Sequence, residues 1–370
     1  MKIIVLKNNL LEGINSVERS IGSAANLPIL KNILIKAEGG AIELTATNLE
    51  VASMYAVSGK VIESGSITIP GGIFGTVIKN LASERLTLES SGPSSLLITT
   101  DNYEATIQGT DASEFPIIPE VSNAVSVSIP SSDFLDALAS VIVATQYSEI
   151  RPEISGVFIK LDDGKLTLVA TDSFRLAEKT VPGVALKSGD AVAPFIIPLF
   201  SAEEILRVFK DSDGELSIFI EQNQVAFSAG PKRFISRLVD GRFPDYQAII
   251  PKEFTREFST DAKELVSAIR LTSSFAGKTN DVLISSGSNG KFIDIACGDS
   301  SLGENHYRIP VKLTGDEFKL VFNWRYLLDG MKVLKGAEIY WGIVSPDRAT
   351  LMKSKTDSSL IYIVMPIRRP

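Results

Sequence analysis

An internal repeat constrains this chain more than any other feature of its sequence. The segment Pro28–Asn48, PILKNILIKAEGGAIELTATN, aligns without a gap with Pro152–Asp172, PEISGVFIKLDDGKLTLVATD, at a constant shift of 124 residues. Ala46-Thr47 falls on Ala170-Thr171, and apolar positions such as Ile33 and Leu44 fall on the apolar positions Val157 and Leu168. A period of this kind indicates that one structural unit is used more than once, so we expect a fold built from similar units.

A fainter third copy, with a longer loop, is Asp281–Asp299, DVLISSGSNGKFIDIACGD. Each copy predicts two β-strands joined by a polar turn that contains glycine. Segments that carry proline recur at similar spacing and close each unit: EFPIIPE, RFPDYQAIIP and the terminal YIVMPIRRP. We therefore predict three domains, residues 1–120, 121–250 and 251–370.

Two amphipathic helices are predicted in each unit. The first helices are 6–21, 132–148 and 261–276, and the second helices are 73–81, 201–209 and 324–334. Phe134, Leu138 and Val141 illustrate the spacing that places apolar side chains on one helix face. Ser132 and Asp261 are predicted N-caps. Many short strands beside these helices favour the α+β class, with helices on one face of antiparallel sheets.

The scarcity of histidine and cysteine excludes several kinds of chemistry. Among 370 residues there is one histidine, His306, and one cysteine, Cys297. A Cys/His zinc site is therefore excluded, and so is any Ser-His-Asp mechanism that does not use His306. His306 has no nucleophile motif near it, so a surface position is favoured. We predict no catalytic residue, no metal site and no cofactor, and hence no enzyme.

Two further segments have a functional and a structural interpretation. ITIPGGIFG places three glycines between a strand and a helix, but its GGxxG spacing differs from that of nucleotide-binding loops, so a turn is favoured over a phosphate site. DSDGE resembles part of a calcium loop but lacks the closing glutamate, so a solvated turn is favoured there.

Charge and hydropathy limit the partners and the compartment. The net charge is −7, which argues against a uniformly basic nucleic-acid binder. It divides into +2 over the six predicted helices with their flanking residues and −9 over the rest of the chain. No apolar run reaches the ~18 residues of a membrane helix, and no signal peptide is recognised. A single cysteine fits the cytoplasm.

Several motifs together resemble one known family. They are LPILKNILI at 27–35, LTATNLEV at 44–51, LVATDSFRLA at 168–177, RLVDGRFPDYQAIIP at 237–251 and the terminal IVMPIRRP. In this order and at this spacing, along the full chain, they resemble the beta subunit of bacterial DNA polymerase III, the beta sliding clamp.

The resemblance implies the DNA clamp fold, with three repeated clamp domains. Helices would line the interior of a ring, and antiparallel sheets would lie outside. Two chains would form a head-to-tail homodimer that encircles double-stranded DNA without sequence preference. As a processivity factor in the cytoplasm it would tether the DNA polymerase III catalytic subunit and bind the clamp loader and other proteins that carry a clamp-binding motif. The alternative is a peptide-binding adaptor of clamp fold that does not close around DNA.

The resemblance also implies a cleft for a partner peptide with an apolar end. Its residues would come from strand ends and from the C-terminus; they are Ile154, Thr171, Ser173, Phe174, Arg175, Leu176, Pro244, Ile249, Asn323, Tyr326, Ile363, Met365, Pro366, Ile367 and Arg368. Apolar lining suits a Leu/Phe-ended peptide, and methionine adapts to several partners. The residues expected to face DNA are Lys79, Arg207, Arg270 and Lys278.

The chain departs from the family pattern at a few positions. Phe174 stands where the family most often has histidine, and Arg369-Pro370 extends the usual ending. Ala24 lies in a loop where some members place a basic DNA contact. Ser273 and Ser274 fall where members often have apolar residues at the ring-closing interface, so Phe275 is expected to contribute there.

Overall fold

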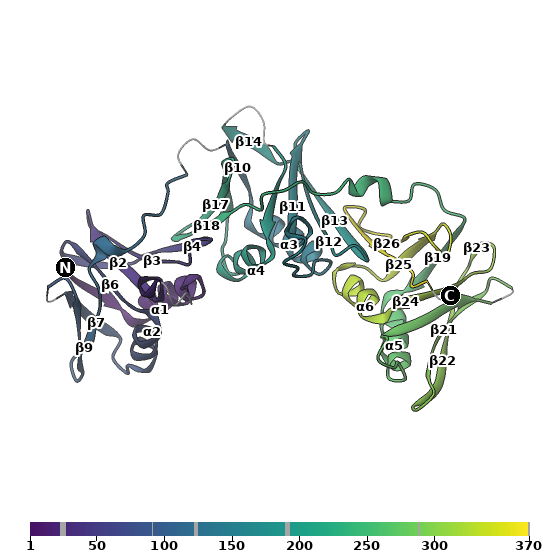
Figure 1. The fold of residues 1–370 in the computed structure, drawn as a ribbon, viewed down its shortest axis with the longest axis horizontal. Helices are drawn as coiled ribbons and strands as arrows, with labels where there is room; N and C mark the ends of the chain where they lie inside the picture. The colour runs from purple at the N-terminus through teal and green to yellow at the C-terminus, as the bar shows by residue number, and fades with distance from the viewer. Residues whose placement is uncertain (23–26, 91, 122–124, 189–192, 288, 369–370) are drawn as a thin grey trace. The chain divides into compact units, whose positions relative to one another are not determined.

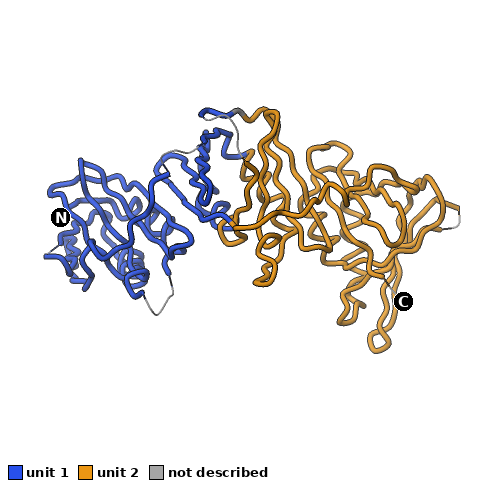
Figure 2. Tube along the Cα trace, turned by 45° about the horizontal axis from the view of Figure 1, so that its top comes forward, with its two compact units in different colours: residues 1–132, 185–192, 203–238 blue, residues 133–184, 193–202, 239–370 orange. Residues whose placement is uncertain are grey.

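The computed structural model describes residues 1–22, 27–90, 92–121, 125–188, 193–287 and 289–368. Ala24 and Arg369-Pro370 lie outside the described residues. Contacts within the chain group its residues into two compact units (Figure 2). Unit 1 comprises 1–132, 185–192 and 203–238, and unit 2 comprises 133–184, 193–202 and 239–370. The division into three domains therefore stays a prediction at this point.

Unit 1 contains two antiparallel sheets (Figure 1). The five-stranded sheet has the order β5 (Gly59–Glu63), β1 (Lys2–Leu6), β7 (Arg85–Ser90), β8 (Ser95–Thr99) and β9 (Glu104–Gln108). The nine-stranded sheet has the order β14 (Ala185–Ser188), β10 (Val125–Pro130), β16 (Glu215–Ile220), β17 (Gln224–Ala229), β18 (Lys232–Arg237), β4 (Val51–Val57), β3 (Ala41–Thr47), β2 (Asn32–Glu38) and β6 (Gly65–Pro70).

Unit 2 has the same composition of one long and one short antiparallel sheet. The nine-stranded sheet has the order β15 (Phe195–Pro198), β11 (Gly156–Asp162), β12 (Lys165–Thr171), β13 (Arg175–Pro182), β27 (Leu360–Val364), β26 (Thr350–Ser354), β25 (Glu338–Ile343), β19 (Arg256–Asp261) and β23 (Thr314–Gly315). The four-stranded sheet has the order β22 (Gly303–Pro310), β21 (Phe292–Asp299), β20 (Asp281–Ser286) and β24 (Lys319–Asn323).

The described residues contain six α-helices, at the places that the apolar periodicity predicts. They are α1 (Lys7–Val17), α2 (Gly71–Asn80), α3 (Ser131–Ile142), α4 (Leu199–Val208), α5 (Ala262–Ser273) and α6 (Trp324–Val333). Asp261 is the N-cap of α5, and its carboxylate accepts from the Glu264 amide at 2.8 Å, as expected. Ser132 is not an N-cap, because α3 already begins at Ser131. Among the described residues, none of the helices is both long and apolar enough to span a membrane.

The repeat is present in the structure at the level of single residues. Hairpin β2–β3 and hairpin β11–β12 have the same bounds after a shift of 124, and the same register: Leu34 faces Thr45, and Phe158 faces Val169. The third copy forms hairpin β20–β21, in which Leu283 faces Ala296. All three copies were predicted as two strands joined by a turn, and this prediction is confirmed.

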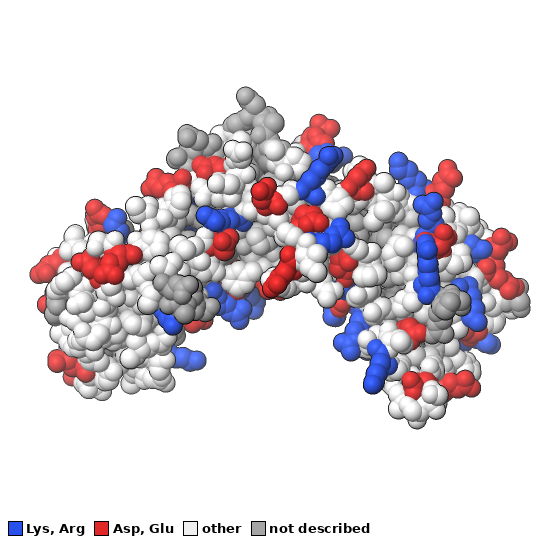
Figure 3. All heavy atoms as spheres, viewed as in Figure 1, with Lys and Arg blue, Asp and Glu red and all other residues white. Residues whose placement is uncertain are grey.

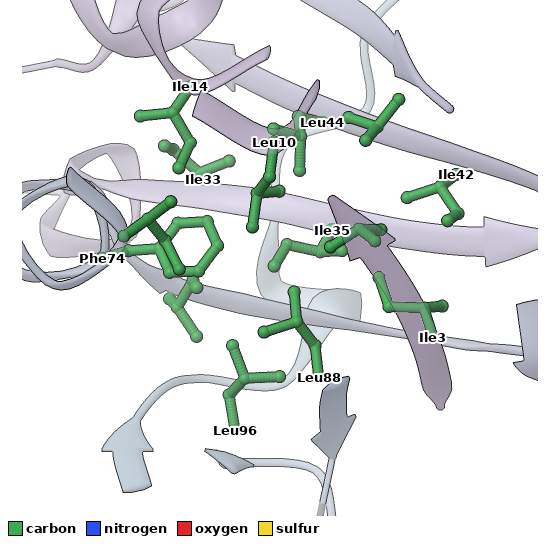
Figure 4. Packing of buried hydrophobic residues seen from close by; sticks show 14 of the residues in the cluster. Ile3, Leu10, Ile14, Ile33, Ile35, Ile42, Leu44, Phe74, Leu88 and Leu96 are labelled. Atoms are coloured by element: carbon green, nitrogen blue, oxygen red, sulfur yellow. The ribbon is translucent and has the colours of Figure 1, made fainter. Parts of the chain in front are cut away.

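Apolar side chains from helices and sheets meet in a common core in the N-terminal part of unit 1 (Figure 4). Leu10 and Ile14 of α1 and Phe74 of α2 pack against side chains of both sheets of this unit, and all three side chains are almost completely buried. The strand residues of this core alternate along their strands, so one face of each sheet is covered by the helices. The α+β class with antiparallel sheets is confirmed.

Each nine-stranded sheet is continuous across two segments that are far apart in the sequence. In unit 1, β4 pairs with β18, and we call this pair the first seam. In unit 2, β13 pairs with β27, and we call this pair the second seam. The shorter sheets end at β5 and β24 on one side and at β9 and β22 on the other, and among the described residues β9 and β22 each have one strand neighbour. These two edges therefore present backbone N–H and C=O groups without a partner strand.

Candidate functional site

Residues Thr171–Arg175 form a tight turn between β12 and β13. The Thr171 hydroxyl donates to the carbonyl oxygen of Arg175 at 2.7 Å and accepts from the Ser173 amide at 3.1 Å. Asp172 Oδ1 accepts from the amides of Phe174 and Arg175 at 2.9 and 3.0 Å. Ser173 takes φ of 76°, a left-handed conformation that a tight turn of this kind requires. The polar residues of this turn therefore hold the backbone, and the Phe174 side chain is left outside.

Arg175 connects this turn to helix α6. Its guanidinium donates to Asp172 Oδ2 at 3.0 Å and also to the Asp329 carboxylate of α6. It lies over the Tyr326 ring with 4.4 Å between Cζ and the ring centroid. Lys332 donates to the other Asp329 oxygen at 2.6 Å. The side chain of Arg175 is only 10% exposed, so this cation is an internal brace of the site.

The surroundings of Arg175 stabilise its charged form. Burial disfavours the charged guanidinium, but interactions with Tyr362, Asp329 and Asp172 outweigh it, and the pKa of Arg175 is raised above its ordinary value. The Tyr362 hydroxyl donates to the backbone carbonyl of Tyr326 at 2.8 Å, which ties β27 to α6. The site is therefore held in one geometry by a permanent charge and by buried hydrogen bonds.

An apolar cluster lies beneath the second seam. Its buried members are Val169, Leu176, Ile196, Phe243, Tyr246, Ala349 and Ile363, and its partly buried members are Phe158, Val239, Ile250 and Met365. Phe158 and Phe243 stack with centroids 4.8 Å apart. Leu176 of β13 faces Ile363 of β27 in the register of the seam. Three predicted site residues, Leu176, Ile363 and Met365, are thus brought together in one cluster.

Exposed apolar side chains lie at the ends of the segments that supply this cluster. Phe174 is 59% exposed and Ile249 is 51% exposed, both large values for side chains of this kind. The carbonyl of Phe174 accepts from the Met365 amide at 2.8 Å, so these two predicted residues are neighbours. Cluster and exposed residues together offer apolar surface to a partner, whereas scattered apolar side chains would need no explanation.

The C-terminal segment lines a pocket beside β24. Pro366, Ile367 and Arg368 line a pocket of about 520 Å³ together with Val321 and Asp347. The Ile367 amide donates to the carbonyl of Val321 at 2.7 Å, which fixes the segment against the sheet. This pocket belongs to unit 2, as does every predicted cleft residue.

The remaining predicted cleft residues have clear structural positions. Asn323 is the N-cap of α6, where its side chain accepts from the Arg325 amide at 3.0 Å. Ile154 is buried, and Pro244 is exposed one residue after Phe243. Sequence reasoning missed Asp329, which pairs with Arg175. Its position on a predicted helix and its charge give no signal of that pairing.

The residues expected to face DNA differ in what their side chains do. Lys79, Arg270 and Lys278 are exposed. Arg207 is not free, because its guanidinium donates to Glu204 at 2.8 Å and to the carbonyl oxygens of Asn15 and Ser16 at 2.5 and 3.2 Å. Its donors serve contacts inside unit 1.

Two grooves between helices are lined by cations, which include Lys79 and Arg270 from the predicted DNA-facing set and others that the sequence did not single out. Between α1 and α2, Arg19 and Lys79 line a groove of about 640 Å³. Between α5 and α6, Arg270, Arg325 and Lys332 line a groove of about 450 Å³. Elsewhere Lys and Arg are interspersed with Asp and Glu, as the face in Figure 3 shows. The two grooves thus occupy equivalent places in the first and third copies of the repeat.

The other chemical expectations concern single residues. His306 is exposed on β22, as predicted, and Cys297 is buried on β21. Among the described residues, no group of three or more His, Cys, Asp or Glu side chains is arranged to hold a metal ion. Ser274 is exposed after α5, while Ser273 and Phe275 are half-buried. Leu271 of α5 is 57% exposed and was not singled out from the sequence.

Three family models match consecutive parts of the chain. They describe the DNA polymerase III beta subunit: its N-terminal domain on residues 1–119, its central domain on 128–245 and its C-terminal domain on 247–368. The Beta sliding clamp of Bacillus subtilis is 27% identical over 378 residues, which cover 100% of both chains. That of Synechococcus elongatus is 26% identical over 375 residues, which cover 100% of this chain and 99% of the relative.

Solved structures agree with these matches. A crystal structure of the DNA polymerase sliding clamp from Bacillus subtilis is similar with a TM-score of 0.94 at 27% identity and covers 100% of both chains. A crystal structure of the DNA polymerase III subunit beta from Pseudomonas aeruginosa is similar with a TM-score of 0.94 at 25% identity and the same coverage. The similarity thus extends over the whole chain.

Proposed function

Because the chain belongs to the DNA polymerase III beta subunit family and is a DNA sliding clamp, we propose that two copies join head to tail into a closed ring around duplex DNA. The fold is the α+β DNA clamp fold, with three clamp domains. We propose 1–120, 121–250 and 251–370 as their bounds, with the helices toward the DNA and the sheets outside. The adaptor alternative is not favoured. The proposal needs no catalytic step and places the protein in the cytoplasm with the DNA.

The pairing of strands supports this ring. Each copy of the repeat follows its hairpin with one more strand: β4, β13 and β22. Each also has a three-stranded meander that ends in β9, β18 or β27. The first set pairs with the second set at both seams, β4 with β18 and β13 with β27. β22 and β9 remain as unpaired edges of the same two types, so a second copy can pair with both.

This closure predicts the register between two copies. In the second seam Leu176 faces Ile363, and in the first seam Ala52 faces Ile235. The same alignment of repeats places Glu304 of β22, which faces Gly298 as Leu176 faces Thr171, opposite Thr106 of β9 from the other copy. Paired edges of this kind join in a ring rather than in an open fibre when the rotation closes. Leu271 and Leu302, both more than half exposed, would be covered near this joint.

A ring that slides needs only weak attraction for DNA. Cations contribute through release of counterions from the phosphates, a term that depends on salt and not on base sequence. Exposed Lys79, Arg270 and Lys278 and the cations of the α1–α2 and α5–α6 grooves would supply it. We do not expect Arg207 to contribute much, since its guanidinium is committed to Glu204 and to α1.

We propose the second seam and the adjoining C-terminal segment as the docking site for partner proteins. The DNA polymerase III catalytic subunit, the clamp loader and other proteins with a clamp-binding motif would each insert an apolar peptide end. The cluster that contains Leu176, Ile363 and Met365, with Phe174 beside it, is the observation that supports this site. Burial of one leucine or phenylalanine side chain contributes about 1.5–3 kcal/mol, so two such anchors supply about 3–6 of the about 8 kcal/mol that a micromolar complex needs.

Retention on DNA tests the ring. We expect the clamp, once loaded, to stay on a closed circular duplex and to leave the same duplex after linearisation. Equal retention on both forms would contradict a topological link. Repeating the measurement at several salt concentrations separates topology from charge, because only the charge term falls with salt.

A further inference from the structure

The two seams have the same backbone construction. At the first seam the Thr47 hydroxyl donates to the carbonyl of Val51 at 2.7 Å and accepts from the Leu49 amide at 3.0 Å. Asn48 Oδ1 accepts from the amides of Glu50 and Val51 at 3.0 and 2.8 Å. Leu49 takes φ of 74°, against 76° for Ser173 in the second seam. Each bond of the Thr171–Arg175 turn that involves the backbone thus has a counterpart 124 residues earlier, whereas the bond from the Arg175 side chain to Asp172 has none, because residue 51 is valine.

The strands that face these turns also correspond. Arg237 donates its amide N–H to the carbonyl of Glu50 at 2.9 Å, just as Met365 donates to the carbonyl of Phe174 at 2.8 Å. An isoleucine stands two residues earlier in both strands, at 235 and 363. Residues 50 and 237 in the first seam are therefore equivalent to 174 and 365 in the second.

The side chains at these equivalent positions have opposite character. Glu50 replaces Phe174 and Arg237 replaces Met365, and the two form an ion pair at 3.7 Å that is mostly exposed. Ala52 stands where the second seam has Leu176. The buried cluster under the first seam is correspondingly small: Ala52, Val121, Ala226 and Ile235.

We propose that residues 50/237 and 174/365 decide which of the two seams accepts a partner peptide, the polar pair at the first seam excluding it. This inference rests on the proposed docking function and adds the residues that restrict it to one of two equivalent places. An apolar peptide end at the first seam would have to displace water from Glu50 and Arg237. An exposed ion pair contributes little to stability, so its effect here is to keep the surface hydrated.

The number of binding sites tests the proposal. A short synthetic peptide that ends in Leu-Phe is titrated calorimetrically into the full-length protein. We expect one peptide per chain. Two peptides per chain with intact seams would overturn the inference and leave the docking function standing. No binding at all would overturn both, while retention on circular DNA would still test the clamp itself.

Exchanging the side chains between seams sharpens the test. Phe174→Glu with Met365→Arg gives the second seam the first seam's pair, and we expect at least a tenfold loss of peptide affinity. Glu50→Phe with Arg237→Met gives the first seam the second seam's pair, and we expect a second, weaker site. A count that stays at one in this second variant would contradict the assigned role of residues 50 and 237.

A matched control keeps one positive and one negative side chain at the first seam but exchanges their positions. Glu50→Arg with Arg237→Glu should still bind one peptide per chain with unchanged affinity. All four altered side chains lie at exposed or half-buried positions, so thermal unfolding is expected to stay close to that of the unaltered protein. Retention of Phe174→Glu/Met365→Arg on circular DNA would show that only partner docking has been lost.

Discussion

Replacing Arg175 by methionine separates stability from partner binding at the second seam. The side chain is 10% exposed, and its guanidinium reaches two carboxylates and the face of one aromatic ring. Methionine keeps much of the volume and removes the charge. If Arg175 is an internal brace, the free energy of unfolding falls and peptide affinity does not.

The size of the loss follows from what remains after the replacement. The Asp172 carboxylate, only 3% exposed, keeps the backbone amides of Phe174 and of residue 175 as donors. Asp329 keeps Lys332. Removing one partner of a buried ion pair costs about 3–5 kcal/mol when the other is left uncompensated. Because both carboxylates keep donors, we expect a loss at the lower end, about 3 kcal/mol.

Tryptophan fluorescence provides a local assay for this loss. Both tryptophans of the chain, Trp324 and Trp341, lie in the part that matches the C-terminal family model, and Trp341 is fully buried. Urea unfolding followed by their emission therefore reports on this part of the chain. With a slope of about 1–3 kcal/mol per M, the midpoint should move by about 1 M or more. Arg175→Lys keeps the charge but not the two-pronged geometry, so an intermediate loss is expected.

Peptide titration provides the result that would refute the description of Arg175 as an internal brace. At a temperature where the methionine variant is folded, affinity for the Leu-Phe peptide should stay within about threefold, less than 1 kcal/mol. A variant of unchanged stability that loses more than tenfold in affinity would show that the guanidinium contacts the peptide directly, and the brace would be the wrong description.

Three further predictions concern other parts of the chain. Asp357 pairs with Lys179 at 2.9 Å, and although burial opposes it, the bonds from Ser359 and Lys179 lower the pKa of Asp357 from 3.8 to about 2. Its contribution is present above pH 3.8 and lost as pH falls through about 2, so Asp357→Asn should lose about 1 kcal/mol at pH 7, and the gap should close in acid unfolding titrations. Leu49 holds a left-handed φ of 74°, and Leu49→Asn should raise the unfolding free energy by about 0.5–1 kcal/mol in urea titrations; an unchanged midpoint would argue against strain there. Thr106→Cys combined with Glu304→Cys should cross-link two chains under oxidation, while either single variant should not; no cross-link would exclude the proposed register.

Local structure was predictable wherever the internal repeat or the apolar periodicity indicated it. The hairpins at 32–47 and 156–171 follow from alternation and glycine turns, and the six helices follow from apolar spacing. Helix ends were less certain: Ser132 was expected to cap α3 and instead lies inside it, because the chain already turns into the helix after Pro130. Side chains that cap a helix and those in its first turn are drawn from similar residue types.

Pairing between distant strands was not predictable in the same way. Nothing in the alternation of β13 shows that its edge partner is β27, nearly two hundred residues later, because register and partner are set by tertiary contacts. The same holds for Arg207, whose charge on a helix predicted an open surface. Its bonds to Glu204 and to carbonyls of α1 depend on how that helix packs. The family resemblance named many site residues, but only the structure shows which of them brace the site and which are exposed.

Repetition of one unit creates a problem that the side chains then solve. Three copies of the same hairpin and meander would make equivalent seams, each with the same turn and the same backbone bonds. The proposed single docking site per chain requires these places to differ, and the backbone does not distinguish them. Glu50 with Arg237 keeps the first seam polar, and Phe174 with Met365 keeps the second apolar. Among the described residues β22 and β9 have no partner strand on their outer side, and we propose that a second copy pairs with them. Specialisation of equivalent seams through a few side chains would therefore account for both the proposed docking and the proposed ring closure on a single backbone plan.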